Sequence, residues 1–285
     1  MEKDIFVIKK FSEQFPVLLE NIYNPPEQLF WRGTALGNED KIGIVGMRKC
    51  SREGIEIAKK ITDQCVKKGL TIVSGLANGI DSAVHEQAIA SRGKTIAVLP
   101  CGLKAVRQNY QLMQKILAAG GTAISEYEPE AEARKFTFLE RNRIISGLCK
   151  GIIVIEADFK SGALNTASHA LKQNRMTWAV PGNIDRIQSR GTNNLIKKNE
   201  ASLLTGVEDL KDIFQFSGGA AASTQLNLSL EERLITKLLD QENLSTAELE
   251  KKTGIDYGEL ILLLTNLELE KIIFQNFLNK WQKLT

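Results

Sequence analysis

The chain lacks several features that would assign it to a class at once. Its 285 residues include 4 cysteines with no Cys-x-x-Cys pair and only 2 histidines, so a zinc site is not expected. No apolar run approaches the ~18 residues that a membrane-spanning helix needs. The first residues hold lysines but no apolar core of a secretory signal. We therefore expect a cytoplasmic protein with reduced thiols, no bound metal and no membrane association.

Two signatures of nucleotide cofactors and hydrolases are also missing. The dinucleotide fingerprint G-x-G-x-x-G is absent, because Gly43, Gly46 and Gly54 have the wrong spacing. The nucleophile elbow G-x-S-x-G is absent too, and no second histidine lies near His85 in the sequence to complete a triad. We interpret His85 as a structural hydrogen-bonding residue, with a general base as the less favoured alternative. NAD and FAD are disfavoured, and no cofactor is expected.

Charge is balanced overall but unevenly distributed. The net charge is +3, which is too small to indicate a nucleic-acid-binding protein by itself. Residues 226–285 hold 7 basic and 10 acidic residues, whereas the preceding part holds 30 basic and 24 acidic ones. This asymmetry weakly favours an anionic ligand on the larger, basic part.

From Lys41 onward, short apolar runs alternate with helical stretches. The runs are continuous rather than alternating, which predicts strands buried on both faces. This pattern is typical of an α/β fold with a Rossmann-like, doubly wound, mostly parallel sheet. Expected strands cover 42–45, 71–74, 95–99, 122–125, 152–156, 177–180 and, as the weakest, 202–204; expected helices cover 52–67, 80–91, 109–118, 139–147 and 163–173.

Composition divides the chain into four parts. Residues 1–38 are too short for a domain and are predicted to be an extension that packs on the main domain, 39–215. The small residues of 216–228 are typical of a flexible linker. Residues 229–285 then predict a small winged-helix domain with capping boxes at Ser229-x-x-Glu232 and Ser245-x-x-Glu248. We expect its third helix to run from 256 to about 268, with small strands at 272–274 and 277–278.

That third helix has the wrong charge for reading DNA. Residues 256–271 hold four carboxylates, whereas Lys271 is their one cation. A phosphate backbone would be repelled by such a helix. We therefore expect the C-terminal domain to contact protein or to regulate.

Glycine-rich turns follow two of the predicted strands. In doubly wound sheets the ligand lies beyond the carboxyl ends of the strands. Small residues at Ser74, Gly75 and Gly79 let an anion approach the N–H groups that begin the next helix. Ser161-Gly162 forms a second turn of this kind, for which a simple helix cap is the alternative. Both turns predict a phosphate-bearing ligand.

Cations and aromatic rings supply the remaining signal. Arg48 and Lys49 follow the first predicted strand, and residues 134–143 interleave basic and aromatic side chains. This mixture is typical of single-stranded nucleic-acid sites, where bases stack on rings. The alternative is that Phe136 and Phe138 belong to the core and that the arginines lie on a helix surface. Glu156 and Asp158 suggest either an acid–base pair or partners for nearby cations.

Seven segments resemble the DNA-processing protein A (DprA/Smf) family, in the order that this family has them. They are 42–51 (IGIVGMRKCS), 71–81 (TIVSGLANGID), 94–103 (KTIAVLPCGL), 124–129 (ISEYEP), 136–157 (FTFLERNRIISGLCKGIIVIEA), 161–170 (SGALNTASHA), and 179–182 (AVPG) with 192–196 (TNNLI). The resemblance covers about residues 15–215. It implies a domain that binds single-stranded DNA without sequence preference and loads the RecA recombinase onto it, as in natural transformation. It also implies a homodimer and no catalytic activity.

The resemblance also assigns roles to individual residues. Arg48 and Lys135 match phosphate contacts, Phe138 matches an aromatic that meets a base, and 141–143 match an Arg-Asn-Arg signature. The complete predicted DNA-binding set is Gly46, Arg48, Lys49, Ser74, Gly75, Asn78, Gly79, Lys135, Phe138, Arg141, Asn142, Arg143, Ser161, Gly162 and Thr166.

The chain departs from the family pattern at several places near this set, where Met47 and Ala163 also stand in place of the family's serines. Asn78 stands where the family usually has arginine, and the 104–109 segment is shortened and loses a Tyr-Pro-x-x-Asn element. Two alternative functions remain open. One is a phosphoribohydrolase-like nucleotide enzyme, although the P-G-G-x-G-T-x-x-E signature with its glutamate is missing. The other is a small-nucleotide sensor that signals through the winged helix.

Overall fold

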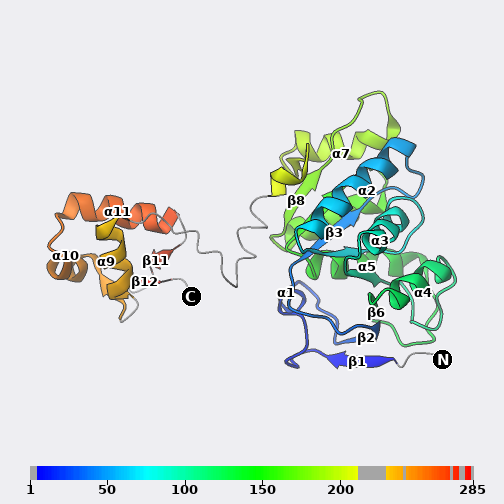
Figure 1. Ribbon diagram of the computed structural model, residues 1–285, viewed down its shortest axis with the longest axis horizontal. Helices are drawn as coiled ribbons and strands as arrows, with labels where there is room; N and C mark the ends of the chain where they lie inside the picture. Colours follow the sequence, from blue (N-terminus) through cyan, green and yellow to red (C-terminus); the bar gives the residue numbers. More distant parts are fainter. Residues whose placement is uncertain (1–4, 211–228, 240–241, 270–271, 276–279, 284–285) are drawn as a thin grey trace. The chain divides into compact units, whose positions relative to one another are not determined.

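The computed structural model describes residues 5–210, 229–239, 242–269, 272–275 and 280–283 (Figure 1). The chain divides into two compact units, residues 1–219 and 220–285. The predicted linker at 216–228 lies outside the described residues. Within the described residues, no helix combines the length and the apolar character needed to cross a membrane.

A nine-stranded sheet forms the centre of the first unit, in the order β1-β2-β6-β5-β4-β3-β7-β8-β9. The strands from β6 to β9 run parallel, and β2 and β1 extend this sheet antiparallel at one side. The mostly parallel α/β fold is thereby confirmed. The strands are β1 (Phe6–Lys9), β2 (Gln28–Gly33), β3 (Lys41–Val45), β4 (Thr71–Ser74), β5 (Thr95–Val98), β6 (Thr122–Ser125), β7 (Gly151–Val154), β8 (Met176–Ala179) and β9 (Ser202–Leu203).

Helices cover both faces of this sheet. The central strands are therefore buried throughout. The side chains of α2, α3 and α4 pack on one face, where α2 and α3 lie side by side (Figure 1). Those of α1, α5 and α6 pack on the other face. The helices are α1 (Val17–Glu20), α2 (Arg52–Lys67), α3 (Ile80–Ala90), α4 (Tyr110–Ala118), α5 (Lys135–Gly147), α6 (Gly162–Lys172) and α7 (Ile187–Lys197), followed by a 3₁₀ turn at Val207–Leu210.

The order of strands places one site at the carboxyl edge of the sheet. Strand β3 pairs with β4 on one side and with β7 on the other, so the chain reverses its winding direction there. The loops that follow β3, β4 and β7 consequently meet at one crevice. Two glycines allow this close approach: a Cβ on Gly46 would lie 2.6 Å from Ile80, and one on Gly79 would lie 2.4 Å from the Met47 carbonyl oxygen.

The second unit is a small helical domain with its own apolar core. Leu249, Leu264 and Trp281 are buried together inside it. Ser245 and Glu248 form the predicted capping box, in which each side chain bonds the other residue's backbone N–H. Predicted strand residues 277–278 lie outside the described residues. The elements are α9 (Leu230–Leu239), β10 (Leu244–Ser245), α10 (Thr246–Thr253), α11 (Tyr257–Leu269), β11 (Ile273–Gln275) and β12 (Lys280–Lys283), with β12 pairing antiparallel to both other strands.

Candidate nucleic-acid interface

A groove of about 740 Å³ lies at the crevice beyond β3, β4 and β7. We call it the carboxyl-edge groove. Its walls come from the loop after β3, the start of α3, the first half of α5 and the turn that begins α6. Ten members of the predicted set line it: Gly46, Arg48, Lys49, Lys135, Phe138, Arg141, Asn142, Ser161, Gly162 and Thr166.

The other five predicted residues do not line this groove. Ser74 is fully buried and donates its hydroxyl hydrogen to the Ile44 carbonyl oxygen at 2.7 Å. Gly75 is buried and Gly79 is half-buried, whereas Asn78 is exposed. Arg143 lies in a different hollow, about 750 Å³ in volume, which α5 and α6 share with residues 23–27.

The carboxyl-edge groove is rich in free positive charge. Arg48, Lys49 and Lys135 are exposed, and the two further cations Arg134 and Lys160 line the groove beside them. None of these five forms an ion pair with any carboxylate of the described chain. Unpaired cations around one hollow attract an anionic ligand and raise its local concentration.

An aromatic ring stands beside these cations. Phe138 is half-buried in the groove wall, and the guanidinium carbon of Arg48 lies 5.0 Å from the centre of its ring. This cation–π contact joins the loop after β3 to helix α5. Phe136, two residues earlier, is about half exposed, so neither ring is a fully enclosed core residue.

Among the helices that follow β3, β4 and β7, two have a carboxylate of the chain itself bound at their start. Glu156 accepts hydrogen bonds at the start of α2 from the Ser51 backbone N–H (2.8 Å) and hydroxyl (2.5 Å). Glu156 therefore caps a helix rather than pairing with cations. At α3, Asp81 accepts from the backbone N–H groups of Gly75 and Ala77.

The start of α6 differs, because no carboxylate of the described residues bonds there. Ser161 caps it with its hydroxyl, which accepts from the Ala163 N–H at 3.3 Å. A Cβ added to Gly162 would meet no atom within 4 Å, so the backbone of this turn faces open space. The N-terminus of α6 thus offers its partial positive charge to an external anion.

Arg141 is a structural member of the groove wall. It is 4% exposed, and its Nη1 donates to the Gly75 carbonyl oxygen (2.6 Å) and to that of Val98. Burial lowers the pKa of its guanidinium to about 10, and the nearby Asp81 carboxylate partly opposes this shift. Burial likewise raises the pKa of Asp81, an effect that Arg141 opposes. Arg141 therefore ties the ends of β4 and β5 together.

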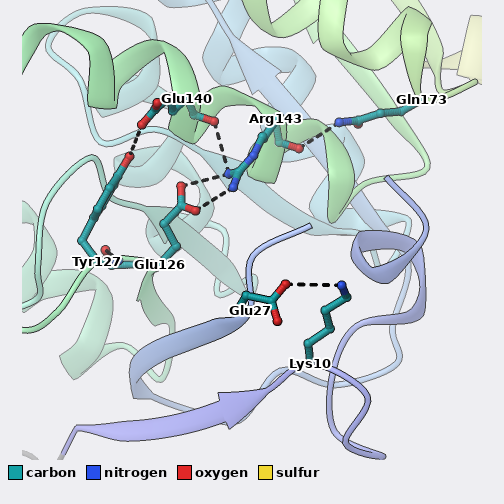
Figure 2. A network of polar contacts seen from close by, with 8 residues as sticks. Lys10, Glu27, Glu126, Tyr127, Glu140, Arg143 and Gln173 are labelled. Atoms are coloured by element: carbon teal, nitrogen blue, oxygen red, sulfur yellow. Dashed lines mark hydrogen bonds and ion pairs between the residues drawn. The ribbon is translucent and has the colours of Figure 1, made fainter. Parts of the chain in front are cut away.

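The two residues after Arg141 point to other partners. The Asn142 amide donates to the Gly162 carbonyl oxygen (3.3 Å) and to Asn165 (3.1 Å), which positions the start of α6. Arg143 binds Glu126 through two parallel hydrogen bonds of 2.9 and 2.6 Å (Figure 2). In the same network, Glu140 accepts from the Tyr127 hydroxyl. The three residues of the Arg-Asn-Arg sequence thus each bind a different part of the protein: the ends of β4 and β5, the start of α6, and Glu126.

His85 is fully buried on α3. Its Nδ1 lies 2.8 Å from the Thr95 hydroxyl oxygen. Burial, with a smaller contribution from Arg141, lowers its pKa to about 3, so the imidazole is neutral at pH 7. These contacts confirm the structural interpretation of this histidine.

Comparison with known proteins decides the family. The family model for DNA recombination-mediator protein A matches residues 6–215. This chain belongs to the DNA recombination-mediator protein A family. DNA processing protein DprA of Bacillus subtilis is 40% identical over 73% of this chain and 71% of its own length. DprA of Streptococcus pneumoniae has a solved structure with a TM-score of 0.68 and 37% identity, covering 74% of both chains.

A second relative of known structure has been described with respect to its ligand. DNA processing protein A of Helicobacter pylori is 27% identical, with a TM-score of 0.67 over 75% of this chain and 97% of that one. Its structure was described for a unique single-stranded DNA binding mode.

Two groove cations of this family member were missing from the predicted set. Arg134 and Lys160 each stand next to a predicted residue, Lys135 and Ser161. The sequence signal was therefore present: a cation adjacent to a predicted phosphate contact, on a loop at the carboxyl edge.

Proposed function

We propose that this chain binds single-stranded DNA without sequence preference in the carboxyl-edge groove and acts as a recombination mediator that loads RecA. The observation that carries the proposal is the combination of five unpaired cations, one ring and a vacant helix start in a single groove. The phosphates would lie against the cations and the start of α6, while a base stacks on Phe138. Membership of the recombination-mediator family supports the same conclusion.

The proposal includes no catalytic step. The two carboxylates that line the groove are Asp81 and Asp158, and Asp81 is occupied by backbone N–H groups. Homodimer formation and the contact with RecA are part of this proposal on the strength of the family. Light scattering tests the first, and RecA filament formation on DNA covered by a single-strand-binding protein tests the second.

Binding of labelled oligothymidylate, measured against a matched duplex over a range of salt concentrations, tests the DNA proposal. Arg48→Ala and Lys135→Ala are each expected to weaken binding about tenfold for all sequences alike, because each removes a charged contact. Each is also expected to flatten the plot of log affinity against log salt by about 0.7. The control is Lys115→Ala, an exposed lysine of α4 outside the groove.

Two outcomes would contradict the proposal. One is equal affinity for the duplex and the single strand, since stacking on Phe138 needs an unpaired base. The other is equal losses in Lys115→Ala and in the groove variants, because this would indicate diffuse charge rather than a site.

A further inference from the structure

Helix α11 of the second unit exposes large apolar side chains. Tyr257, Ile261 and Leu262 are 56%, 36% and 63% exposed. Tyr257 and Ile261 lie on the same side of the helix because they are four residues apart, and Leu262 adjoins them. We call these three residues the α11 apolar face. Apolar groups that gather on one element, rather than being scattered singly, mark surfaces that bind other molecules.

The core of the second unit is built from a different side of the same helix. Leu260, Leu264 and Leu267 are buried in the core cluster, where they pack with Leu249 and Trp281. The α11 apolar face is therefore additional to the side that stabilises the domain. A helix with apolar side chains on both its buried and its exposed sides has a second surface to bury.

Carboxylates border the α11 apolar face. Glu259 and Glu268 are exposed, and neither forms an ion pair with any described residue. Asp256, just before the helix, accepts a hydrogen bond from the Gly258 backbone N–H at 3.1 Å. Helix α11 itself contains no lysine or arginine. This charge attracts a cationic partner and repels the phosphates of a nucleic acid.

The position of α11 in the domain makes this surface informative. Helices α10 and α11 are the two helices of a helix-turn-helix, in which α10 ends at Gly254 in the left-handed conformation (Figure 1). In domains that read DNA, the second of these helices enters the major groove and contacts base edges. Here the second helix presents apolar and acidic side chains, which suit a protein rather than DNA.

We infer that the α11 apolar face docks a cationic amphipathic helix of another protein. The apolar side chains of that helix pack on the three residues of the face, and its lysines or arginines lie beside Glu259 and Glu268. Tyr257 is the anchor, because tyrosines are enriched among the residues that dominate binding energy. A second copy of α11 is a poor occupant, since it would bring the same carboxylates into contact. The inference concerns the second unit and is independent of DNA binding by the first.

Peptide binding to the full chain tests this inference. The probe is a fluorescein-labelled peptide of leucine and lysine, about five helical turns long, with its leucines on one side. The reference peptide has the same residues in an order that forms no apolar side. Fluorescence anisotropy at low salt measures both affinities. We expect the amphipathic peptide to bind at least about tenfold more tightly. The cationic carboxyl-edge groove repels both peptides and so does not compete for them.

Two variants of α11 locate the binding surface. Tyr257→Ala is expected to weaken binding of the amphipathic peptide about tenfold, because it removes the anchor. Its control is Tyr110→Ala, which removes a comparably exposed tyrosine from α4 of the first unit. Glu259→Gln is expected to weaken binding about threefold at low salt and to have no effect at high salt, since salt screens exposed charges. Its control is Glu86→Gln, an exposed glutamate of α3.

Three outcomes would overturn the inference. The first is equal affinity of the unaltered protein for the two peptides, or binding of neither. The second is a loss in Tyr257→Ala no larger than that in Tyr110→Ala. If urea unfolding shows that Tyr257→Ala does not fold, Leu262→Gln replaces it and is expected to weaken binding severalfold. The third is binding of a labelled DNA duplex that Tyr257→Ala abolishes, because this would make DNA the occupant of the face.

Discussion

Two turns at the carboxyl edge begin with the same two residues and have opposite roles. Ser74 ends β4 and Gly75 follows it, whereas Ser161 caps α6 and Gly162 begins it. The first turn is buried, and a Cβ on Gly75 would lie 2.6 Å from the Arg141 guanidinium. The second turn lines the groove and has open space over its glycine. A serine-glycine pair before a helix therefore indicates an anion site only when the space beside it is vacant.

The difference comes from the side chain that bonds each turn inside the protein. The Ser74-Gly75 turn is followed by Asp81, whose carboxylate takes the N–H groups that a phosphate would otherwise bind. The Ser161-Gly162 turn is met by Asn142, a neutral amide that bonds a carbonyl oxygen and leaves the N–H groups alone. The chain thus fills one anion site itself and leaves the other to a ligand.

Removing the Arg141 guanidinium, which lies against the buried Ser74-Gly75 turn, should have the largest effect on stability. Arg141→Ala is expected to lower the free energy of unfolding by about 3–5 kcal/mol, because Asp81 and two carbonyl oxygens lose their buried partner. Urea unfolding measures this loss. Arg134→Ala, an exposed arginine of the same groove, is the control and should change stability by less than about 0.5 kcal/mol. An Arg141→Ala variant as stable as this control would show that the contacts of Arg141 do not stabilise the fold.

A methyl group on the buried turn should have an intermediate effect. Gly75→Ala is expected to cost about 1–3 kcal/mol of unfolding free energy, because the Arg141 guanidinium has to move away from its carbonyl partners. The same urea measurement applies. A normal unfolding free energy would mean that the turn has room for a side chain, and its contrast with Gly162 would disappear.

A methyl group on the open turn should leave stability intact and change binding alone. Gly162→Ala meets no protein atom and lies in the first turn of a helix, so stability should stay equal or rise by up to about 1 kcal/mol. Affinity for oligothymidylate should fall about tenfold, since the methyl group obstructs the phosphate. Gly206→Ala, which also meets no atom within 4 Å but lies outside the groove, is the control. Unchanged affinity in Gly162→Ala would place the phosphates elsewhere.

Much of the fold could be predicted because the central strands are short, uninterrupted apolar runs. The bounds of β4 and β6 agree residue for residue with the prediction. Helix α7 was missed because Ser189, Gly191, Thr192 and two asparagines have weak helix propensity. Tertiary contact supplies what propensity lacks: the Gly191 N–H donates to the Ala157 carbonyl oxygen at 2.7 Å.

Helix α5 shows a similar limit at its start. It begins at Lys135 rather than at the predicted residue 139. The Thr137 hydroxyl oxygen accepts from the Arg134 backbone N–H at 3.0 Å, an unusual cap that no Ser-x-x-Glu pattern announces. The earlier start matters for the site, because it fixes Lys135 and Phe138 on a rigid element.

The candidate site could be predicted as a region, but the roles inside it could not. Residue type and position after a strand were enough to gather Arg48, Lys135 and Ser161 at one edge. Whether an arginine points into the groove depends on carbonyl and carboxylate partners that are distant in sequence. Arg141 donates to the Val98 carbonyl oxygen and Arg143 to the Glu126 carboxylate, so both guanidinium groups have partners inside the protein.

The edge of the sheet that β1 forms affects solubility rather than DNA binding. Strand β1 pairs with β2 alone among the described strands, so its outer edge presents free backbone groups, and Phe6 and Val7 beside it are about half exposed. An open edge with apolar side chains can recruit a strand from another molecule. Here the edge strand is only four residues long; it ends at Lys9, and Lys10 follows it. Brevity and terminal charge are what keep such an edge from seeding aggregation.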